Sequence, residues 1–121
     1  MFTVTVETGF TASHQVGTAQ DRTEPVHEHK WLIRTSVSVA KLDKTGLAMD
    51  FMDLKSIVER ATSTFNGSRL EELPCFHGLN VSAETLARYI HDKIELLLPS
   101  NVKLRCVEVV EEPGCMVKYS K

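Results

Sequence analysis

Two segments near the N-terminus alternate between apolar and polar side chains with a period of two. Residues 2–10 and residues 29–42 both follow this pattern, which is typical of strands with one buried face. Residues 43–46 are turn-forming and end the second strand. Residues 11–25 are polar and aperiodic, and connections of this length are more often functional than not. The sequence therefore predicts two strands joined by a loop that belongs to a site.

The apolar period changes to that of an α-helix in the middle of the chain. Apolar residues recur at helical spacing after Asp50 and Asp53, either of which can cap the helix: Leu54, Ile57, Val58, Ala61 and Phe65. A second helix begins after Ser82, a suitable N-cap, and ends before Pro99. The sequence thus predicts two helices, separated by an irregular connector over residues 74–80.

The C-terminal residues predict a hairpin. Residues 102–111 and 115–119 read as strands, and residues 112–114 as the turn between them. The predicted order is therefore strand, strand, helix, helix, strand, strand. Strands and helices segregated in this way are typical of an α+β domain, with an antiparallel four-stranded sheet and both helices on one face.

Composition limits the function classes that the chain can belong to. Its 121 residues suffice for one domain, residues 1–121. With 14 Lys and Arg against 16 Asp and Glu, the net charge of −2 lacks the basic footprint of a nucleic-acid binder. No apolar run approaches the roughly 20 residues that span a bilayer, and no signal-peptide pattern is present. Three cysteines without CxxC spacing argue against a disulfide framework. We expect a cytoplasmic protein without nucleic-acid or membrane partners.

The histidines are the strongest candidates for a metal site. His27 and His29 are two residues apart at the start of the second strand, so both imidazoles lie on one face. Catalytic zinc commonly takes three protein ligands, and His14 supplies the third if the two strands pair antiparallel. The alternative is that these are surface loop histidines. His77 is expected to be either a loop residue or a proton-transfer group, and His91 a half-buried helix residue.

Two glutamates are candidates for substrate contact and catalysis. Glu111 shares the strand parity of Val107 and Val109, and a carboxylate on an apolar face must be paired or hydrogen-bonded. Glu111 therefore either holds a ligand that has adjacent N–H donors or turns into water at the hairpin. Glu24 lies three residues before His27, where it is either a general base or an ordinary loop carboxylate.

Taken together, five segments in order resemble the 6-pyruvoyl-tetrahydropterin synthase / 6-carboxytetrahydropterin synthase family. They are FTASH at residues 10–14, HEH at 27–29, MDFMDLK at 49–55, SAETLARYI at 82–90, and Glu111 with Tyr119. The resemblance implies a tunnelling fold (T-fold) of ββααββ order, with trimers that pair into a hexamer. It also implies a zinc ion held by His14, His27 and His29, and a pterin ring anchored by Glu111. Ser82 is expected as a further substrate-binding residue.

The chain departs from the family pattern at three places. Family synthases have a catalytic cysteine shortly before the HxH pair, where this chain has Asp21, Thr23 and Glu24. After the first helix the family usually has an Asp-His pair, where this chain has Asn66-Gly67. Glu28 replaces the usual glycine between the metal histidines. The thiolate and the usual proton-relay pair are therefore both missing.

With Glu24 three residues before His27, the chain resembles a variant subgroup of the family in which a glutamate at this position replaces the cysteine. That subgroup cleaves the side chain of 7,8-dihydroneopterin to give 6-hydroxymethyl-7,8-dihydropterin. We therefore hypothesise a zinc-dependent pterin lyase with Glu24 as base and His77 or water as the proton donor, acting on 7,8-dihydroneopterin or its triphosphate. The alternative is a catalytically altered homologue that binds a pterin-like ligand without synthase activity.

The size of the domain bears on where the substrate binds. A domain of 121 residues has little volume left to enclose a deep pocket alone. The sheets of neighbouring subunits are expected to join into a barrel, which also removes exposed sheet edges. The pocket is then expected between subunits, with the histidines from one chain and Glu111 facing them from another.

Overall fold

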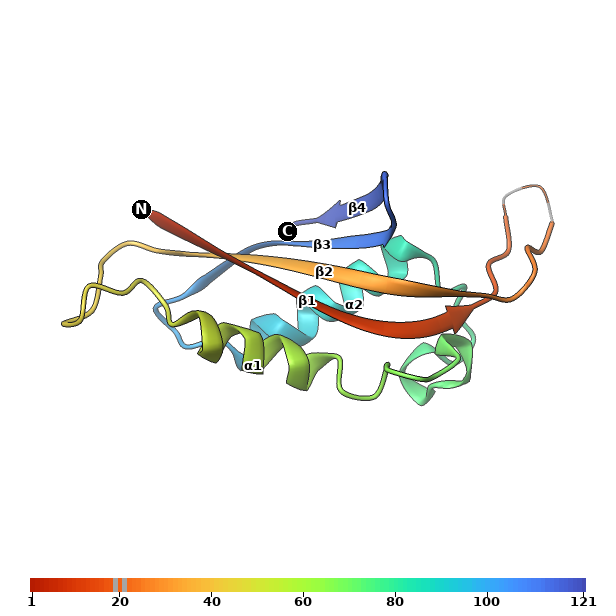
Figure 1. Cartoon of the computed structure of the whole chain (residues 1–121), viewed down its shortest axis with the longest axis horizontal. Helices are drawn as coiled ribbons and strands as arrows, with labels where there is room; N and C mark the ends of the chain where they lie inside the picture. The colour runs from red at the N-terminus through yellow and green to blue at the C-terminus, as the bar shows by residue number, and fades with distance from the viewer. Residues whose placement is uncertain (19, 21) are drawn as a thin grey trace.

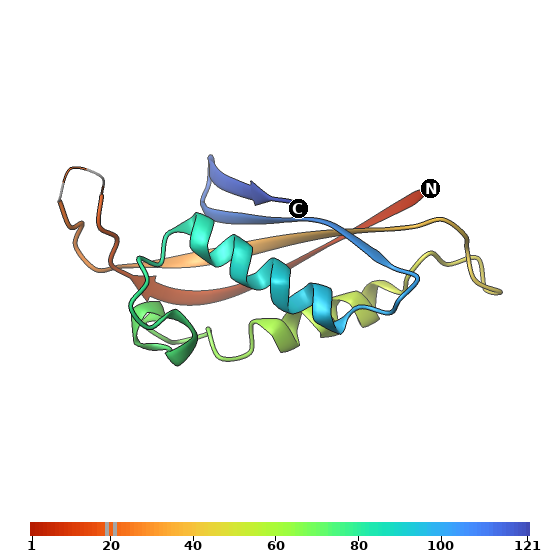
Figure 2. The ribbon, with the colours of Figure 1, turned by 180° about the vertical axis from the view of Figure 1, so that it is seen from behind.

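The computed structural model describes every residue except Ala19 and Asp21. Four strands form one antiparallel sheet in the order β1-β2-β3-β4. They are β1 (Phe2–His14), β2 (His27–Val39), β3 (Lys103–Glu112) and β4 (Cys115–Tyr119). The helices α1 (Phe51–Ala61) and α2 (Ala83–Leu97) both lie on one face of the sheet (Figure 1; Figure 2). The predicted α+β fold is confirmed.

The first strand is longer than the alternation predicted. β1 continues to His14, and it pairs with β2 over its whole length, from Phe2 opposite Val39 to His14 opposite His27. Its other edge is also occupied near the end, because the Gly67 N–H donates to the Thr11 carbonyl at 2.7 Å. The loop therefore starts at Gln15, not at residue 11. The polarity of residues 11–14 predicted a loop, but backbone hydrogen bonds on both sides make these residues part of the strand.

The boundaries of β2 also differ from the prediction. The strand begins at His27 rather than residue 29 and ends at Val39 rather than residue 42. The early start follows from the pairing with β1, which continues to the His14–His27 pair. Both metal-candidate histidines of this segment therefore lie inside the sheet.

Each helix begins at a side-chain cap. The Asp50 carboxylate accepts hydrogen bonds from the backbone N–H groups of Met52 and Asp53, at 2.7 and 3.4 Å. The Ser82 hydroxyl accepts from the Thr85 N–H at 3.1 Å, as the sequence predicted. Such a cap contributes about 1 kcal/mol to stability. In the connector between the helices lie two short 3₁₀ turns, η1 (Leu70–Glu72) and η2 (Pro74–Phe76).

The helices bury their apolar faces against the sheet. The buried residues of α2 are Ala83, Leu86, Ala87, Ile90, His91 and Ile94, and those of α1 are Leu54 and Val58. His91 is fully buried rather than half-buried, because its ring packs edge-on against Tyr119 of β4, with centroids 4.9 Å apart. Its Nδ1 lies 3.1 Å from an oxygen of Asp92. Packing against β4, which the helix pattern alone does not show, accounts for the difference.

An aromatic cluster supports the end of the sheet that carries the histidines. Phe65 is fully buried and packs against Phe10 and Phe76, with ring centroids 5.3 and 5.6 Å apart. Trp31 is also buried, and its indole N–H donates to the Ala12 carbonyl at 3.1 Å. These contacts hold the ends of β1 and β2 rigidly against the connector.

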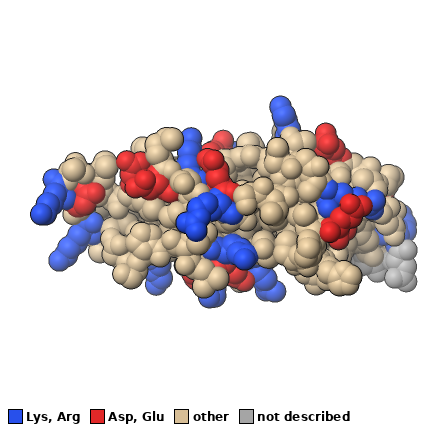
Figure 3. Space-filling model, turned by 90° about the horizontal axis from the view of Figure 1, so that it is seen from below, with Lys and Arg blue, Asp and Glu red and all other residues tan. Residues whose placement is uncertain are grey.

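The face of the sheet away from the helices carries charged side chains together with exposed apolar ones such as Leu32 and Met116. Arg34 lies between two carboxylates, with nitrogens 2.7 Å from oxygens of both Glu7 and Glu108. On the helix side, acidic and basic side chains are interspersed (Figure 3). None of the described helices is long and apolar enough to cross a membrane.

Candidate metal centre

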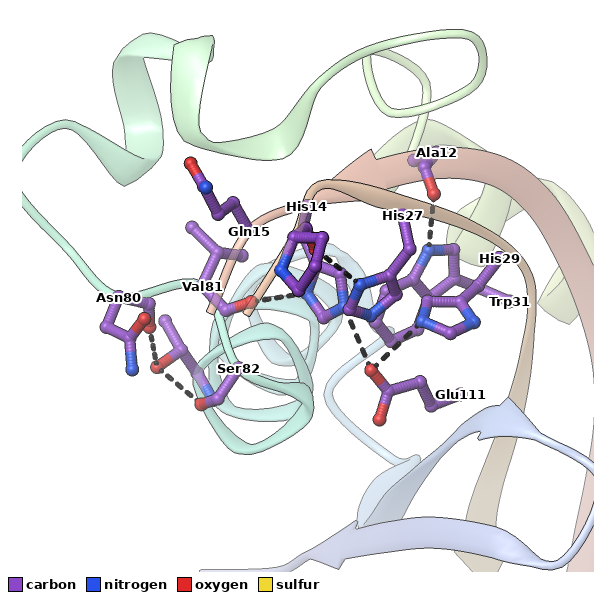
Figure 4. Close-up of polar contacts among 12 residues, drawn as sticks. Ala12, His14, Gln15, His27, His29, Trp31, Asn80, Val81, Ser82 and Glu111 are labelled. Carbon is purple, nitrogen blue, oxygen red and sulfur yellow. Dashed lines mark hydrogen bonds and ion pairs between the residues drawn. The ribbon is translucent and has the colours of Figure 1, made fainter. Parts of the chain in front are cut away.

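Three histidines converge where β1 ends and β2 begins. His14 is the last residue of β1, not a loop residue, and it faces His27 as its cross-strand partner. His29 lies on the same face of β2 as His27. The Nε2 atoms of His14 and His27 are 3.2 Å apart. Antiparallel pairing therefore brings the three imidazoles together, as Figure 4 shows.

Backbone carbonyls set the orientation of two of these rings. His14 Nδ1 lies 2.8 Å from the Val81 carbonyl, and His27 Nδ1 lies 2.8 Å from the Pro25 carbonyl. A carbonyl only accepts, so each Nδ1 carries the hydrogen and donates it. In the neutral ring this leaves the Nε2 lone pair directed at the centre of the cluster. Metal-binding histidines are oriented by the same kind of outer hydrogen bond.

Glu111 completes the cluster from β3. Its Oε1 lies 2.9 Å from His14 Nε2 and 3.2 Å from His29 Nε2. The register between β3 and β4 shifts between Val110 and Glu112, and a bulge of this kind re-aims the side chain that it contains. The carboxylate thus points to the histidines and not into water. It does so within one chain, which corrects the expectation that a neighbouring subunit presents it.

The cluster has the charge balance of a cation site. Lone pairs of His14 and His27 and a carboxylate oxygen converge at hydrogen-bond distance, which is repulsive unless a positive charge lies among them. Burial lowers the pKa of His29, which disfavours a proton as that charge on its ring. Its Nε2 is buried and has no hydrogen-bond partner among the described residues. The geometry is that of a potential metal-binding group.

The donor atoms also have the spacing that zinc requires. Four ligand atoms, one from each of His14, His27, His29 and Glu111, lie within 4.8 Å of one another. Two nitrogens bound to tetrahedral zinc at 2.0–2.1 Å are about 3.3 Å apart, close to the 3.2 Å between the Nε2 atoms of His14 and His27. Imidazole and carboxylate are both common zinc ligands. The residues present therefore fit a zinc ion.

Comparison with known proteins gives the family. The model of the family described as 6-pyruvoyl tetrahydropterin synthase matches residues 3–121. The chain belongs to this family. It is 30% identical over 113 residues to a candidate 6-carboxy-5,6,7,8-tetrahydropterin synthase of Archaeoglobus fulgidus, covering 93% of this chain and 79% of that protein. Members of the family are lyases of pterin metabolism.

Solved structures of family enzymes share the fold. The 6-pyruvoyl tetrahydropterin synthase of Caenorhabditis elegans superposes with a TM-score of 0.79 at 20% identity, covering 100% of this chain and 97% of that one. The Plasmodium falciparum synthase gives a TM-score of 0.76 at 18% identity, with coverage of 99% and 97%. A Plasmodium vivax structure at 14% identity and a TM-score of 0.76, with coverage of 99% and 97%, is a variant in which a catalytic glutamate is replaced by alanine. The four-stranded sheet with two helices is the T-fold.

Glu24 lies three residues before His27 in the chain. It is not one of the four residues of the metal group, which are His14, His27, His29 and Glu111. The segment after His14 folds back on itself, and the Glu24 N–H donates to the Val16 carbonyl at 2.9 Å. A bridge joins Gly17 and Thr23 further along the same ribbon. The Glu24 side chain is exposed. Asp21, in the stretch where the family has its cysteine, lies outside the described residues.

The other two predicted site residues, Ser82 and His77, lie between η2 and the start of α2. Ser82 is half-buried, and its hydroxyl is used as the cap of α2. It directly follows Val81, whose carbonyl orients His14. His77 is exposed at the end of η2. No contact between His77 and the metal group is found among the described residues.

Sequence reasoning missed the residues that position this site. Asn80 holds the base of the loop, because its Oδ1 accepts from the Gly17 N–H and its Nδ2 donates to the Gly17 carbonyl, both at 2.9 Å. Asn66, where the family usually has an aspartate, accepts from the Thr11 N–H at 3.0 Å. No local signal marks either asparagine, since both partners are backbone groups more than 50 residues away in the chain. Asn66 therefore has a structural use at the position where the resemblance implies a residue that assists proton transfer.

Proposed function

We propose that this chain is a zinc-dependent lyase acting on the side chain of a dihydropterin, with 7,8-dihydroneopterin or its triphosphate as substrate. The observation that supports it is the convergence of His14, His27 and His29 with Glu111 in a member of a pterin synthase family. Zinc held by these residues would supply Lewis acidity that lowers the pKa of a substrate hydroxyl.

Glu24 is proposed as the general base. Its backbone lies three residues before His27, and its N–H donates to the carbonyl of Val16, two residues after His14. From there its carboxylate would take the proton of a side-chain hydroxyl as the adjacent carbon–carbon bond breaks and that oxygen becomes an aldehyde carbonyl. The glutamate that is catalytic in the Plasmodium vivax synthase supports a carboxylate in this role.

The remaining proposed roles are to bind the pterin ring and to return a proton to the product. Glu111 would hold the amino and N3 hydrogens of the pterin, with Ser82 nearby at the start of α2. His77 or water would return a proton to the carbon that stays on the ring. His77 lies four residues before Val81, the residue that orients His14.

The active form is proposed to be a cytoplasmic hexamer of two trimers. β1 and β4 are the end strands of the sheet, and joining them to the end strands of neighbouring copies would close a barrel. The substrate pocket would then lie between subunits. A dilute monomer should be inactive even though it contains the complete metal group.

Metal analysis combined with turnover tests this proposal. We expect one zinc ion per chain and release of 6-hydroxymethyl-7,8-dihydropterin from 7,8-dihydroneopterin. Stoichiometric zinc without product from dihydroneopterin or its triphosphate would contradict the lyase. That result, together with tight pterin binding, would favour the alternative of a binding protein, which the structural use of Asn66 supports.

A further inference from the structure

We infer that Glu111 is the fourth protein ligand of the metal when no substrate is bound, so that the resting centre is closed. The inference rests on the proposed zinc site. Catalytic zinc usually keeps its fourth coordination position for water or substrate. The inference goes further than the proposed site because it assigns this position to a side chain of the same chain.

The contacts of Glu111 are those of a ligand and not of a hydrogen-bond acceptor. Oε1 lies 2.9 Å from His14 Nε2 and 3.2 Å from His29 Nε2. His14 donates through its Nδ1 to the Val81 carbonyl, so the neutral ring has no hydrogen left to give to Glu111. The buried His29 Nε2 has no hydrogen-bond partner among the described residues, although Oε1 is close to it. A cation shared by oxygen and nitrogens explains both short contacts.

The distances match one coordination shell. Adjacent ligand atoms around tetrahedral zinc are about 3.3 Å apart. Three pairs have this spacing within 0.4 Å: His14 to His27 at 3.2 Å, His14 to Glu111 at 2.9 Å and His29 to Glu111 at 3.2 Å. Oε1 is therefore spaced from the imidazole nitrogens as a fourth ligand of one metal ion would be.

The position of Glu111 in the fold lets it leave that corner. It lies in the bulge of β3 beside the turn at Pro113–Gly114, and its side chain is 27% exposed, against 1% for His14. A partly exposed carboxylate at a bulge can rotate, whereas a buried ring hydrogen-bonded to a carbonyl cannot. A substrate hydroxyl would then take the place of Oε1, and the freed carboxylate would hold the pterin ring.

Cobalt substitution with Glu111→Gln tests the inference without relying on turnover. Co²⁺ reports the number and kind of ligands through its visible absorption, and azide reports whether a position is open. For the original chain we expect a four-coordinate spectrum that azide leaves unchanged. In Glu111→Gln the spectrum should change and azide should bind. The dissociation constant for zinc should rise by at least about tenfold, because even the loss of an outer hydrogen-bond partner of a ligand lowers metal affinity by roughly 10–100-fold. Glu112→Gln, an exposed neighbour, is the matched control and should behave as the original chain.

The outcomes separate the inference from the proposed function. If the original chain takes up no metal, the zinc-dependent function fails. If it takes up metal, and azide binds equally to it and to Glu111→Gln with the same zinc affinity, the closed centre is wrong while the function stands. Should Glu111→Gln not fold, Glu111→Asp gives the same test, because a shorter carboxylate cannot reach the same corner.

Discussion

His14 and His27 face each other across the first strand pair with their Nε2 atoms 3.2 Å apart, and each ring is held by a backbone carbonyl on its far side. In the proposed zinc site, this pair would supply two of the ligand nitrogens. Replacing His27 by alanine should therefore lower zinc affinity by more than the roughly 10–100-fold that loss of an outer partner costs. Competition with a chromophoric chelator measures this. His77→Ala is the control. An equal loss of zinc affinity in His77→Ala would show that His27 is not a specific zinc ligand.

Glu24→Gln separates chemistry from metal binding. The change keeps the size of the side chain and removes the base, so kcat for dihydropterin cleavage should fall by about 10²–10⁴. Zinc content should stay at the level of the original chain, because Glu24 is not among the four metal-group residues. Glu28→Gln, an exposed carboxylate on the other face of β2, should retain activity. Unchanged turnover in Glu24→Gln would assign the base elsewhere.

Asn80→Ala should loosen the loop that carries Glu24. The substitution removes two 2.9 Å hydrogen bonds to Gly17, with an expected loss of about 1–2 kcal/mol in the free energy of unfolding. Hydrogen exchange at the Gly17 amide should accelerate more than exchange in the sheet. Asn101→Ala, at an exposed turn, serves as control. Equal exchange at Gly17 in the two variants would show that Asn80 does not hold the loop.

Phe65→Ala tests the aromatic cluster beneath the metal end of the sheet. The side chain is fully buried between Phe10 and Phe76, and truncation of such a residue costs about 3–5 kcal/mol. Chemical denaturation measures the loss. Leu96→Ala, whose side chain is 82% exposed on α2, should change stability by no more than about 0.5 kcal/mol. Similar losses in both variants would contradict the packing described.

Tyr89 makes stability fall at high pH. Burial, and secondly its contact with the Cys75 thiol, raises the pKa of Tyr89 from 10.0 to about 12. The folded state thus keeps a proton that the unfolded chain releases, so this contribution is complete below pH 10 and is lost as the pH rises towards about 12. Denaturation at pH 9 and pH 11 should show a smaller loss in Tyr89→Phe than in Tyr119→Phe. An equal loss would contradict the assignment.

The strand and helix order, the cap at Ser82 and the pairing of His27 with His29 on one face all follow from the sequence. They do so because periods of 2 and 3.6 residues, and capping side chains, act over a few neighbouring positions. His14 as a third histidine near this pair also follows, once the first two strands are taken as antiparallel.

Only the tertiary structure decided how these residues meet. The extent of β1 depends on pairing with β2 and with the connector, which moved His14 from a loop into the sheet. The direction of Glu111 depends on a bulge opposite β4, and the ring orientations depend on carbonyls of Val81 and Pro25. Register, bulges and backbone acceptors carry no local side-chain pattern, since they are set by partners distant in the chain. The histidines were therefore predictable as a group, while their closure by Glu111 of the same chain was not.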